Sequence, residues 1–267
     1  MTLKLTILGC GSSAGVPRAG GNDWGACDPA NPKNRRRRCS ALLEQTSAEG
    51  TTRVLIDTGP DLREQLLAAN VPRLDAVWYT HDHADHTHGI DDIRPLYLIQ
   101  KKRIPIHAPA ETLRTLETRF AYVFVSANNY PAIADPHEIT AYKPVTSHGA
   151  GGAISGLPIP VHHGNIDALC FRIGNTAYMP DVNGIPERAM EALRGLDTLI
   201  IDALRYRHHP SHFMLDETLA VIKELKPRRS IITNMHIDLD YVTLARQLPE
   251  GAVPAYDGMV LELANGA

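Results

Sequence analysis

The segment His81-Asp82-His83-Ala84-Asp85-His86 places three histidines and two aspartates within six residues. In an extended segment, side chains two residues apart project to the same side, so His81 and His83 form one pair. Asp85 and His86 follow at the turn that begins the next predicted helix and form a second pair. Imidazole nitrogen and carboxylate oxygen are ligands that Zn²⁺ prefers, and they also serve Mn²⁺ and Fe²⁺. The pattern favours a metal site over the alternative of a solvated polar loop.

Four further elements end a predicted strand with an aspartate or a histidine. Leu55-Ile56-Asp57-Thr58-Gly59 lies upstream, and Val161-His162-His163-Gly164, Tyr178-Met179-Pro180-Asp181 and Thr233-Asn234-Met235-His236 lie downstream. Loops that follow strands commonly carry functional residues.

The apolar pattern between these elements predicts a layered fold. Leu3, Leu5 and Ile7 alternate with polar residues as in a half-buried strand. Asp61 is a candidate cap for a helix with Leu62, Leu66 and Leu67 on its apolar face. Further strands are predicted at residues 41–43, 54–56, 76–79, 158–161, 170–173, 177–179, 198–201 and 230–233, and helices at 186–194 and 215–225. The Gly-rich segment 147–156 is a flexible loop or a hairpin tip. Two packed sheets with helices outside suit this order.

The five elements in this order resemble the signature of the metallo-β-lactamase superfamily and cover nearly the whole chain. The resemblance implies an α/β (α+β) fold, namely a four-layer αββα sandwich in a single domain over residues 1–267. It also implies a metal-dependent hydrolase with two divalent ions per chain, for which Zn²⁺ is the expected ion and Mn²⁺ the alternative.

The resemblance assigns the ligands position by position. His81, His83 and His163 would hold one ion, Asp85, His86 and His236 would hold the second, and Asp181 would bridge both. His162 competes with His163, which is preferred because the family histidine directly precedes a small residue, here Gly164. Asp57 would orient a ligand by a hydrogen bond. His88 and His107 are interpreted as surface or structural residues.

Hydrolysis of a phosphodiester suits two metal ions and needs a proton for the leaving alkoxide. His209 and His212 are the candidate donors. His212 is similar in position to a catalytic histidine of the phosphodiesterase branches, just before the predicted helix, and is assigned as general acid. Its alternative is a capping or supporting role. Asp57 and Asp85 complete the predicted catalytic residues.

Arg38, Arg94 and His209 are the candidate substrate-binding residues. Residues 35–38 are four consecutive arginines, which form either a solvated loop or a contact to a substrate phosphate. Arg94, in the helix predicted after the His-rich segment, is a candidate for the same contact to a substrate phosphate.

Other motifs narrow the resemblance. Gly9-Cys10-Gly11-Ser12-Ser13-Ala14-Gly15-Val16-Pro17 looks like the start of the tRNA 3′-processing and phosphonate-pathway phosphodiesterases. Trp24-Gly25-Ala26-Cys27-Asp28-Pro29 and Gly89-Ile90-Asp91-Asp92-Ile93-Arg94-Pro95-Leu96 are similar to the phosphonate-pathway cyclic phosphodiesterases. That group carries a structural zinc site of several cysteines and a histidine. Here only Cys27 remains in the segment and Leu239 occupies the histidine position, so we expect no structural zinc.

The predicted function is a phosphodiesterase acting on small nucleotide-like or cyclic phosphate esters. The alternatives are a thioesterase or lactonase, a cofactor-biosynthesis protein resembling the quinone-cofactor pathway member of the superfamily, and a metal-binding module without catalysis. An oxygen-consumption assay or a thioester and lactone panel separates these alternatives.

Composition limits the partners. The chain has 267 residues, 43% apolar and 21% charged, with a net charge of −3. This charge gives no global attraction to nucleic acid or anionic lipid, so we expect neither stable nucleic-acid binding nor a membrane partner. The four cysteines are interpreted as thiols, and the N-terminus lacks signal-peptide features, so a cytoplasmic location is expected. A homodimer is the commonest symmetric assembly, but the sequence leaves the oligomeric state open.

Overall fold

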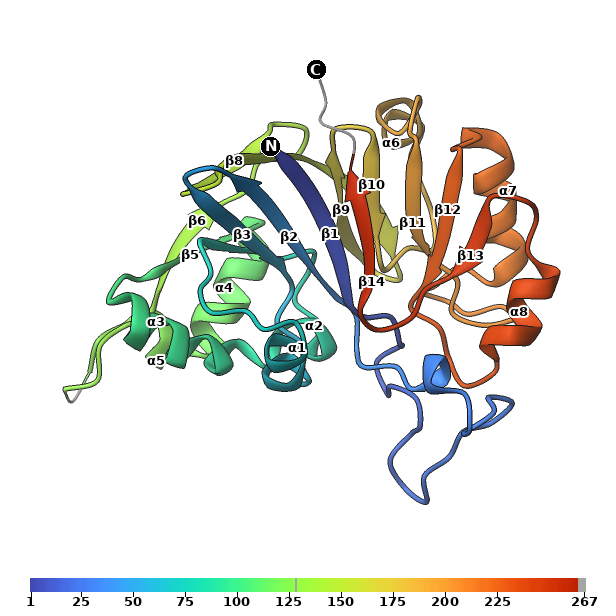
Figure 1. Cartoon of the computed structure of the whole chain (residues 1–267), viewed down its shortest axis with the longest axis horizontal. Helices are drawn as coiled ribbons and strands as arrows, with labels where there is room; N and C mark the ends of the chain where they lie inside the picture. The colour runs from blue at the N-terminus through green and yellow to red at the C-terminus, as the bar shows by residue number, and fades with distance from the viewer. Residues whose placement is uncertain (128, 264–267) are drawn as a thin grey trace.

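Two mixed β-sheets packed face to face form the centre of the molecule (Figure 1). The computed structural model describes residues 1–127 and 129–263. Among these residues, the first sheet has seven strands in the order β14 (Met259–Leu263), β1 (Thr2–Gly9), β2 (Ser40–Ser47), β3 (Gly50–Ile56), β4 (Ala76–Trp78), β5 (Ile104–Ala108) and β6 (Ala134–Glu138). The second has seven in the order β13 (Ala252–Pro254), β12 (Arg229–Thr233), β11 (Thr198–Asp202), β10 (Thr176–Met179), β9 (Ile166–Ile173), β8 (Gly152–His163) and β7 (Val145–Gly149).

Helices cover the outer faces and complete four layers. The first sheet is covered by α1 (Leu62–Ala68), α2 (Ala84–Thr87), α3 (Arg94–Gln100), α4 (Ala110–Arg119) and α5 (Ala121–Phe124), as Figure 1 shows. The second is flanked by α6 (Glu187–Ala192), α7 (Leu215–Leu225) and α8 (Tyr241–Gln247). Short 3₁₀ helices occupy Pro32–Asn34 and Ile90–Ile93. The predicted αββα sandwich is confirmed.

Strand β3 shows why the sequence forms these layers. Val54 and Ile56 enter the large core between the sheets, whereas Leu55 enters the core beneath the helices of the first sheet. Successive side chains of a strand point to opposite faces, so a strand between two cores is apolar throughout. β3 pairs with β4 in parallel and with β2 in an antiparallel hairpin.

A third, small cluster lies apart from the two main cores. It consists of Val16, Cys27 and Ile237, with Trp24 packed against it, and we call it the N-terminal cluster. The Ala26 N–H donates to the Ile237 carbonyl at 2.9 Å, which ties the N-terminal segment to the loop after β12.

The structure refines three local expectations. The segment 147–156 forms the hairpin of β7 and β8, the second of the two alternatives. Helix α1 begins after Asp61, but the Asp61 side chain does not cap it, and Leu67 is 60% exposed rather than on the buried face.

Among the described residues, no helix is long and apolar enough to cross a membrane.

Candidate metal centre

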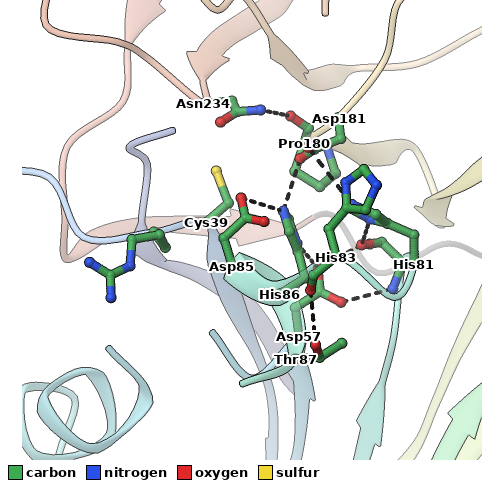
Figure 2. Close-up of polar contacts among 12 residues, drawn as sticks. Cys39, Asp57, His81, His83, Asp85, His86, Thr87, Pro180, Asp181 and Asn234 are labelled. Atoms are coloured by element: carbon green, nitrogen blue, oxygen red, sulfur yellow. Dashed lines mark hydrogen bonds and ion pairs between the residues drawn. The ribbon is translucent and has the colours of Figure 1, made fainter. Parts of the chain in front are cut away.

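The His-rich segment follows strand β4 and bends into helix α2. Figure 2 shows its side chains His81, His83 and His86 close together. His83 is the residue before the helix, with extended backbone angles (φ −63°, ψ 152°). His86 therefore lies inside α2, whereas His81 and His83 precede it. This local geometry agrees with the expectation from the sequence. The extended stretch carries the pair His81 and His83, the helical turn carries the pair Asp85 and His86, and both pairs face the same region.

Two groups of three side chains come together around this segment. His81, His83 and His163 form the first, and His81, His86 and Asp181 form the second, with ligand atoms within 4.8 Å of one another in each. A third group beside them consists of His163, Asp181 and His212. His163 ends β8 and Asp181 follows β10, so the second sheet supplies both. Nε2 of His163 is 3.1 Å from Nδ1 of His83, and Nε2 of His86 is 3.2 Å from Oδ1 of Asp181.

The cluster holds buried polar atoms without hydrogen bonds. Nε2 of His81, Nε2 of His86 and Oδ1 of Asp181 are in this state. An unsatisfied buried polar group costs about 1–3 kcal/mol, and more when it is charged. A divalent cation would satisfy all three atoms at once, and imidazole with carboxylate is a donor set that Zn²⁺ accepts. The residues therefore fit a metal site.

The carboxylates and imidazoles of the cluster shift one another's ionisation. Burial alone would raise the pKa of Asp181. The neighbouring His86, His81 and His212 more than offset this effect and hold the pKa well below its ordinary range. Burial lowers the pKa of His86, and the carboxylates of Asp181, Asp57 and Asp85 more than reverse this shift. Burial and the neighbouring His86 place the pKa of His81 well below its usual value. His81 therefore stays neutral and able to bind a cation.

Asp57 supports the cluster from beneath, at the end of β3. One carboxylate oxygen accepts the Thr80 N–H at 2.8 Å, and the other accepts the Thr80 hydroxyl at 2.7 Å and Nδ1–H of His86 at 2.8 Å. Donating Nδ1–H leaves Nε2 of His86 free to face Asp181. Asp57 thus accepts a hydrogen bond from the candidate ligand His86. Thr80 was missed, since a threonine before the His-rich segment has no distinguishing pattern.

His212 lies at the edge of the cluster and is held by an aspartate. Its Nδ1–H donates to Oδ2 of Asp202 at 2.8 Å, and its ring centroid is 4.7 Å from that of His163. Burial lowers the pKa of His212, but Asp202 and Asp181 more than compensate and raise it to about 9. Asp202 was also missed, although the apolar strand Thr198–Asp202 ending in an aspartate repeats the pattern of Asp57 and Asp181.

The remaining predicted ligands lie close by, outside the two groups. Within residues 1–127 and 129–263, neither Asp85 nor His236 joins a group of three. Asp85 Oδ2 is 3.6 Å from Nε2 of His86, and Nδ1 of His236 is 3.4 Å from Asp238. His162 and His163 separate clearly, because His162 is 59% exposed beside Asp167 whereas His163 is 1% exposed in the cluster.

The predicted substrate-binding residues are dispersed. The Arg94 guanidinium donates to Asp91 and lies over the Tyr122 ring. His209 lies beside His212, with ring centroids 5.1 Å apart, and burial with the neighbouring His212 lowers its pKa to about 4. Arg38 borders a cavity whose lining includes residues 14–17 and 35–38 and none of the candidate metal ligands.

His88 and His107, which the sequence analysis interpreted as surface or structural residues, lie outside the His/Asp cluster. His88 packs edge-on against Phe120, and His107 stacks on His137 across β5 and β6.

Comparison with known proteins places this site in a family. Residues 52–237 match the model described as the beta-lactamase superfamily domain. An octanoyltransferase from Porphyromonas gingivalis is 30% identical over 260 residues, which is 96% of this chain and 51% of that protein. The chain thus spans about half the length of this curated relative.

Solved structures extend the comparison. The crystal structure of a diphosphatase from the PhnP family is 38% identical, with a TM-score of 0.88 over 98% of both chains. Zn²⁺-bound PqqB from Methylobacterium extorquens is 18% identical, with a TM-score of 0.73 over 97% of this chain and 100% of that one. The second likeness concerns the fold alone.

Proposed function

The chain belongs to the beta-lactamase superfamily domain family, and from this premise we propose that it is a binuclear metal-dependent phosphodiesterase acting on small nucleotide-like or cyclic phosphate esters. The observation that carries the proposal is His212, which is fixed by Asp202 at the edge of the His/Asp cluster. The 38% identity to a diphosphatase from the PhnP family supports a substrate that contains phosphate.

The ligand assignment follows the two groups. We assign His81, His83 and His163 to one ion, and His86 with Asp181 to the second. Asp85 and His236 are assigned to the second ion from their positions in α2 and after β12, respectively. When bound, two divalent ions stabilise negative charge on phosphoryl oxygens and activate a water molecule, and Zn²⁺ or Mn²⁺ suits this donor set.

The proton for the leaving group comes from His212. Because Nδ1–H donates to Asp202, Nε2 is the atom that can carry a proton to an alkoxide. Asp202 also stabilises the protonated ring, so the acid form is the one that meets the substrate. Asp57 keeps His86 oriented and takes no part in proton transfer.

The test compares two leaving groups on the same enzyme. We expect His212→Ala to lower kcat for a dinucleoside monophosphate, whose alkoxide needs a proton, by about 10²-fold to 10⁴-fold. The loss should be much smaller for bis(p-nitrophenyl) phosphate, because p-nitrophenolate leaves with little help. Metal content is quantified on the same samples, and His162→Ala is the matched control. Equal losses on both substrates would refute the proton-donor role, and no turnover of either by metal-loaded wild type would refute the phosphodiesterase.

A second candidate is hydrolysis of an acyl thioester. A cavity of about 380 Å³ borders His81 and is lined by apolar side chains that include Ile139, Pro160 and Leu169. Such walls suit an alkyl chain rather than a phosphate, and one relative is an octanoyltransferase. Turnover of an octanoyl thioester without turnover of phosphodiesters would favour this candidate. The quinone-cofactor alternative has support from the fold only.

A further inference from the structure

Arg36 is a buried arginine whose guanidinium binds only neutral acceptors. The residue is 2% exposed, and within the described part of the chain its guanidinium forms no ion pair with a carboxylate. A buried charge is costly unless hydrogen bonds satisfy it. The acceptors that offset this cost therefore identify what the guanidinium holds in place.

The guanidinium connects the loop after β12 to the N-terminal segment. Nη2 donates to the Leu239 carbonyl at 2.6 Å, and Nη1 donates to the His236 carbonyl at 3.2 Å. Toward the N-terminal segment, Nη2 donates to Oδ1 of Asn34 at 3.2 Å, and Nη1 donates to Sγ of Cys27 at 3.9 Å. A guanidinium presents its donors in a fixed planar fork. One group thus holds both carbonyls of the loop at a set separation.

The support for this group is itself well fixed. The N–H of Arg36 donates to the Val16 carbonyl and its carbonyl accepts the Val16 N–H, both at 2.9 Å. Asn34 is fully buried, accepts the Tyr241 N–H at 2.8 Å and donates to Asp240 at 2.7 Å. The guanidinium therefore projects from a defined place on the N-terminal segment.

The loop that Arg36 supports carries His236, a candidate ligand of the second ion. The N–H of His236 donates to the Leu204 carbonyl at 3.0 Å, which fixes the chain on the side of β12. On the other side, the His236 carbonyl accepts the Leu239 N–H at 3.1 Å and the bond from Arg36. Nδ1 of His236 is buried and has no hydrogen bond. The direction of this imidazole thus depends on how the main chain is held.

We propose that Arg36 is a positioning residue for the second metal ion and acts by fixing the main chain of His236. The inference rests on the assignment of His236 to that ion under the proposed function. Asp57 supports its ligand His86 through the imidazole. Arg36 instead supports a ligand through its backbone carbonyl, so its loss should displace the His236 imidazole without removing it.

Zinc affinity tests the proposal without any substrate. Titration of the metal-free protein with Zn²⁺ against a competing chelator gives two dissociation constants, and His236→Ala identifies the one that belongs to the second ion. We expect Arg36→Met to raise this constant by about 10-fold to 100-fold. The constant of the first ion, which we assign to His81, His83 and His163, should stay nearly unchanged.

Arg172→Met is the matched control. The Arg172 guanidinium also donates only to carbonyls, those of Gly174, Ala192 and Arg194, and it extends from β9 rather than toward the loop after β12. Its loss removes the same charge and a similar set of hydrogen bonds. We expect Arg172→Met to change neither dissociation constant.

A double-mutant cycle separates positioning from a general loss of stability. If Arg36 acts through His236, Arg36→Met in a His236→Ala background should change the constant of the second ion by no more than about 2-fold. Arg36→Lys keeps the charge with fewer donors, so it should lose less affinity, and it carries the same comparison if Arg36→Met does not fold. Unchanged constants in both Arg36 variants, or a full loss in the His236→Ala background, would overturn the proposal.

The outcome is independent of turnover. If the wild type binds two ions and hydrolyses no phosphodiester, the phosphodiesterase fails, and the affinities of the Arg36 variants still decide the positioning role. If phosphodiesters are hydrolysed and the cycle shows a full loss in both backgrounds, the proposed function stands and the positioning role is wrong. A wild type that binds fewer than two Zn²⁺ ions would also overturn the inference, because the ion on which it rests would be missing.

Discussion

Asp57 combines an unusual backbone conformation with a buried carboxylate that contacts the His/Asp cluster. Its backbone has a φ of 63°, a conformation that side-chain-bearing residues seldom adopt, although aspartate and asparagine tolerate it best. Burial raises the pKa of its carboxyl, and the hydrogen bonds from His86 and Thr80 oppose this shift. The strained backbone persists because those bonds fix the side chain under the cluster.

The substitution Asp57→Asn tests the hydrogen bond to His86 without disturbing the backbone conformation at residue 57. Asparagine tolerates the same φ, so the loop should keep its shape while the acceptor for Nδ1–H of His86 is weakened. We expect metal affinity to fall by about 10-fold to 100-fold, measured by competition with a chelating indicator. Asp23→Asn, at an exposed loop position, is the control. Unchanged affinity in Asp57→Asn would mean that Asp57 does not orient a ligand.

Single residues were predictable where a pattern repeats. The spacing of His81, His83 and His86 predicted a cluster, and the family resemblance added His163 and Asp181, whose side chains lie with them in the structure. Asp202 was not found, because its partner His212 lies ten residues away across a loop whose path the sequence does not reveal. The roles of the four arginines were equally hidden, since they depend on Asp257, Leu239 and Asp61, which are distant in the chain.

At the scale of elements, strands were more predictable than helix ends. β3 and β11 have apolar, β-branched runs that only a buried strand explains. Strands β5 and β6, with α4 and α5 between them, were not predicted from residues 104–138, where short apolar runs lack a clear period. The Asp61 cap was wrong because its carboxylate pairs with Arg38, a contact between distant segments.

Helix α8 offers a test of an element's contribution to stability. Asp240 is its N-cap and accepts the Thr243 N–H at 2.9 Å, and it also accepts Asn34 Nδ2–H at 2.7 Å. Burial opposes the shift, but these bonds and one from the Asp28 N–H lower the pKa of Asp240 from 3.8 to about 2. The stabilisation is thus present above about pH 4 and is lost as pH falls toward about 2.

Asp240→Ala should lower the free energy of unfolding by about 1–2 kcal/mol at pH 7, measured by urea denaturation. The difference from wild type should narrow as pH falls below about 4, because the wild-type carboxylate then becomes protonated. Asp240→Asn keeps a good capping residue and should lose less. A difference that stays constant down to pH 3 would contradict the linkage.

At the scale of the whole molecule, the cluster joins the two sheets. The His-rich segment follows β4 of the first sheet, whereas His163 and Asp181 come from the second. A bound cation would therefore connect both halves of the sandwich through its ligands. The family resemblance predicted that both sheets supply ligands, because the ligand motifs follow the strands in the family order. The separation of the residues along the sequence alone does not predict it.

Metal removal should accordingly destabilise the whole protein. Ligand at 100 times its Kd stabilises the native state by about 2.7 kcal/mol, which for a chain of this size corresponds to a Tm decrease on the order of 5–10 °C after chelation. Differential scanning calorimetry with and without chelator measures this, and added Zn²⁺ should restore Tm. His163→Ala should show a smaller chelator effect, and His162→Ala the full effect. An unchanged Tm in wild type would argue against metal binding by the native fold.

We expect the N-terminal cluster to open locally before the two main cores do. Val16, Cys27 and Ile237 are separate from the main cores, so exposing them costs far less than global unfolding, and local opening draws on such low-stability regions. The Cys27 thiol would then become reactive before Cys170, which lies in the large core. Amide hydrogen exchange in the N-terminal cluster would likewise run ahead of exchange in β3 and β10, whose side chains lie in the main cores.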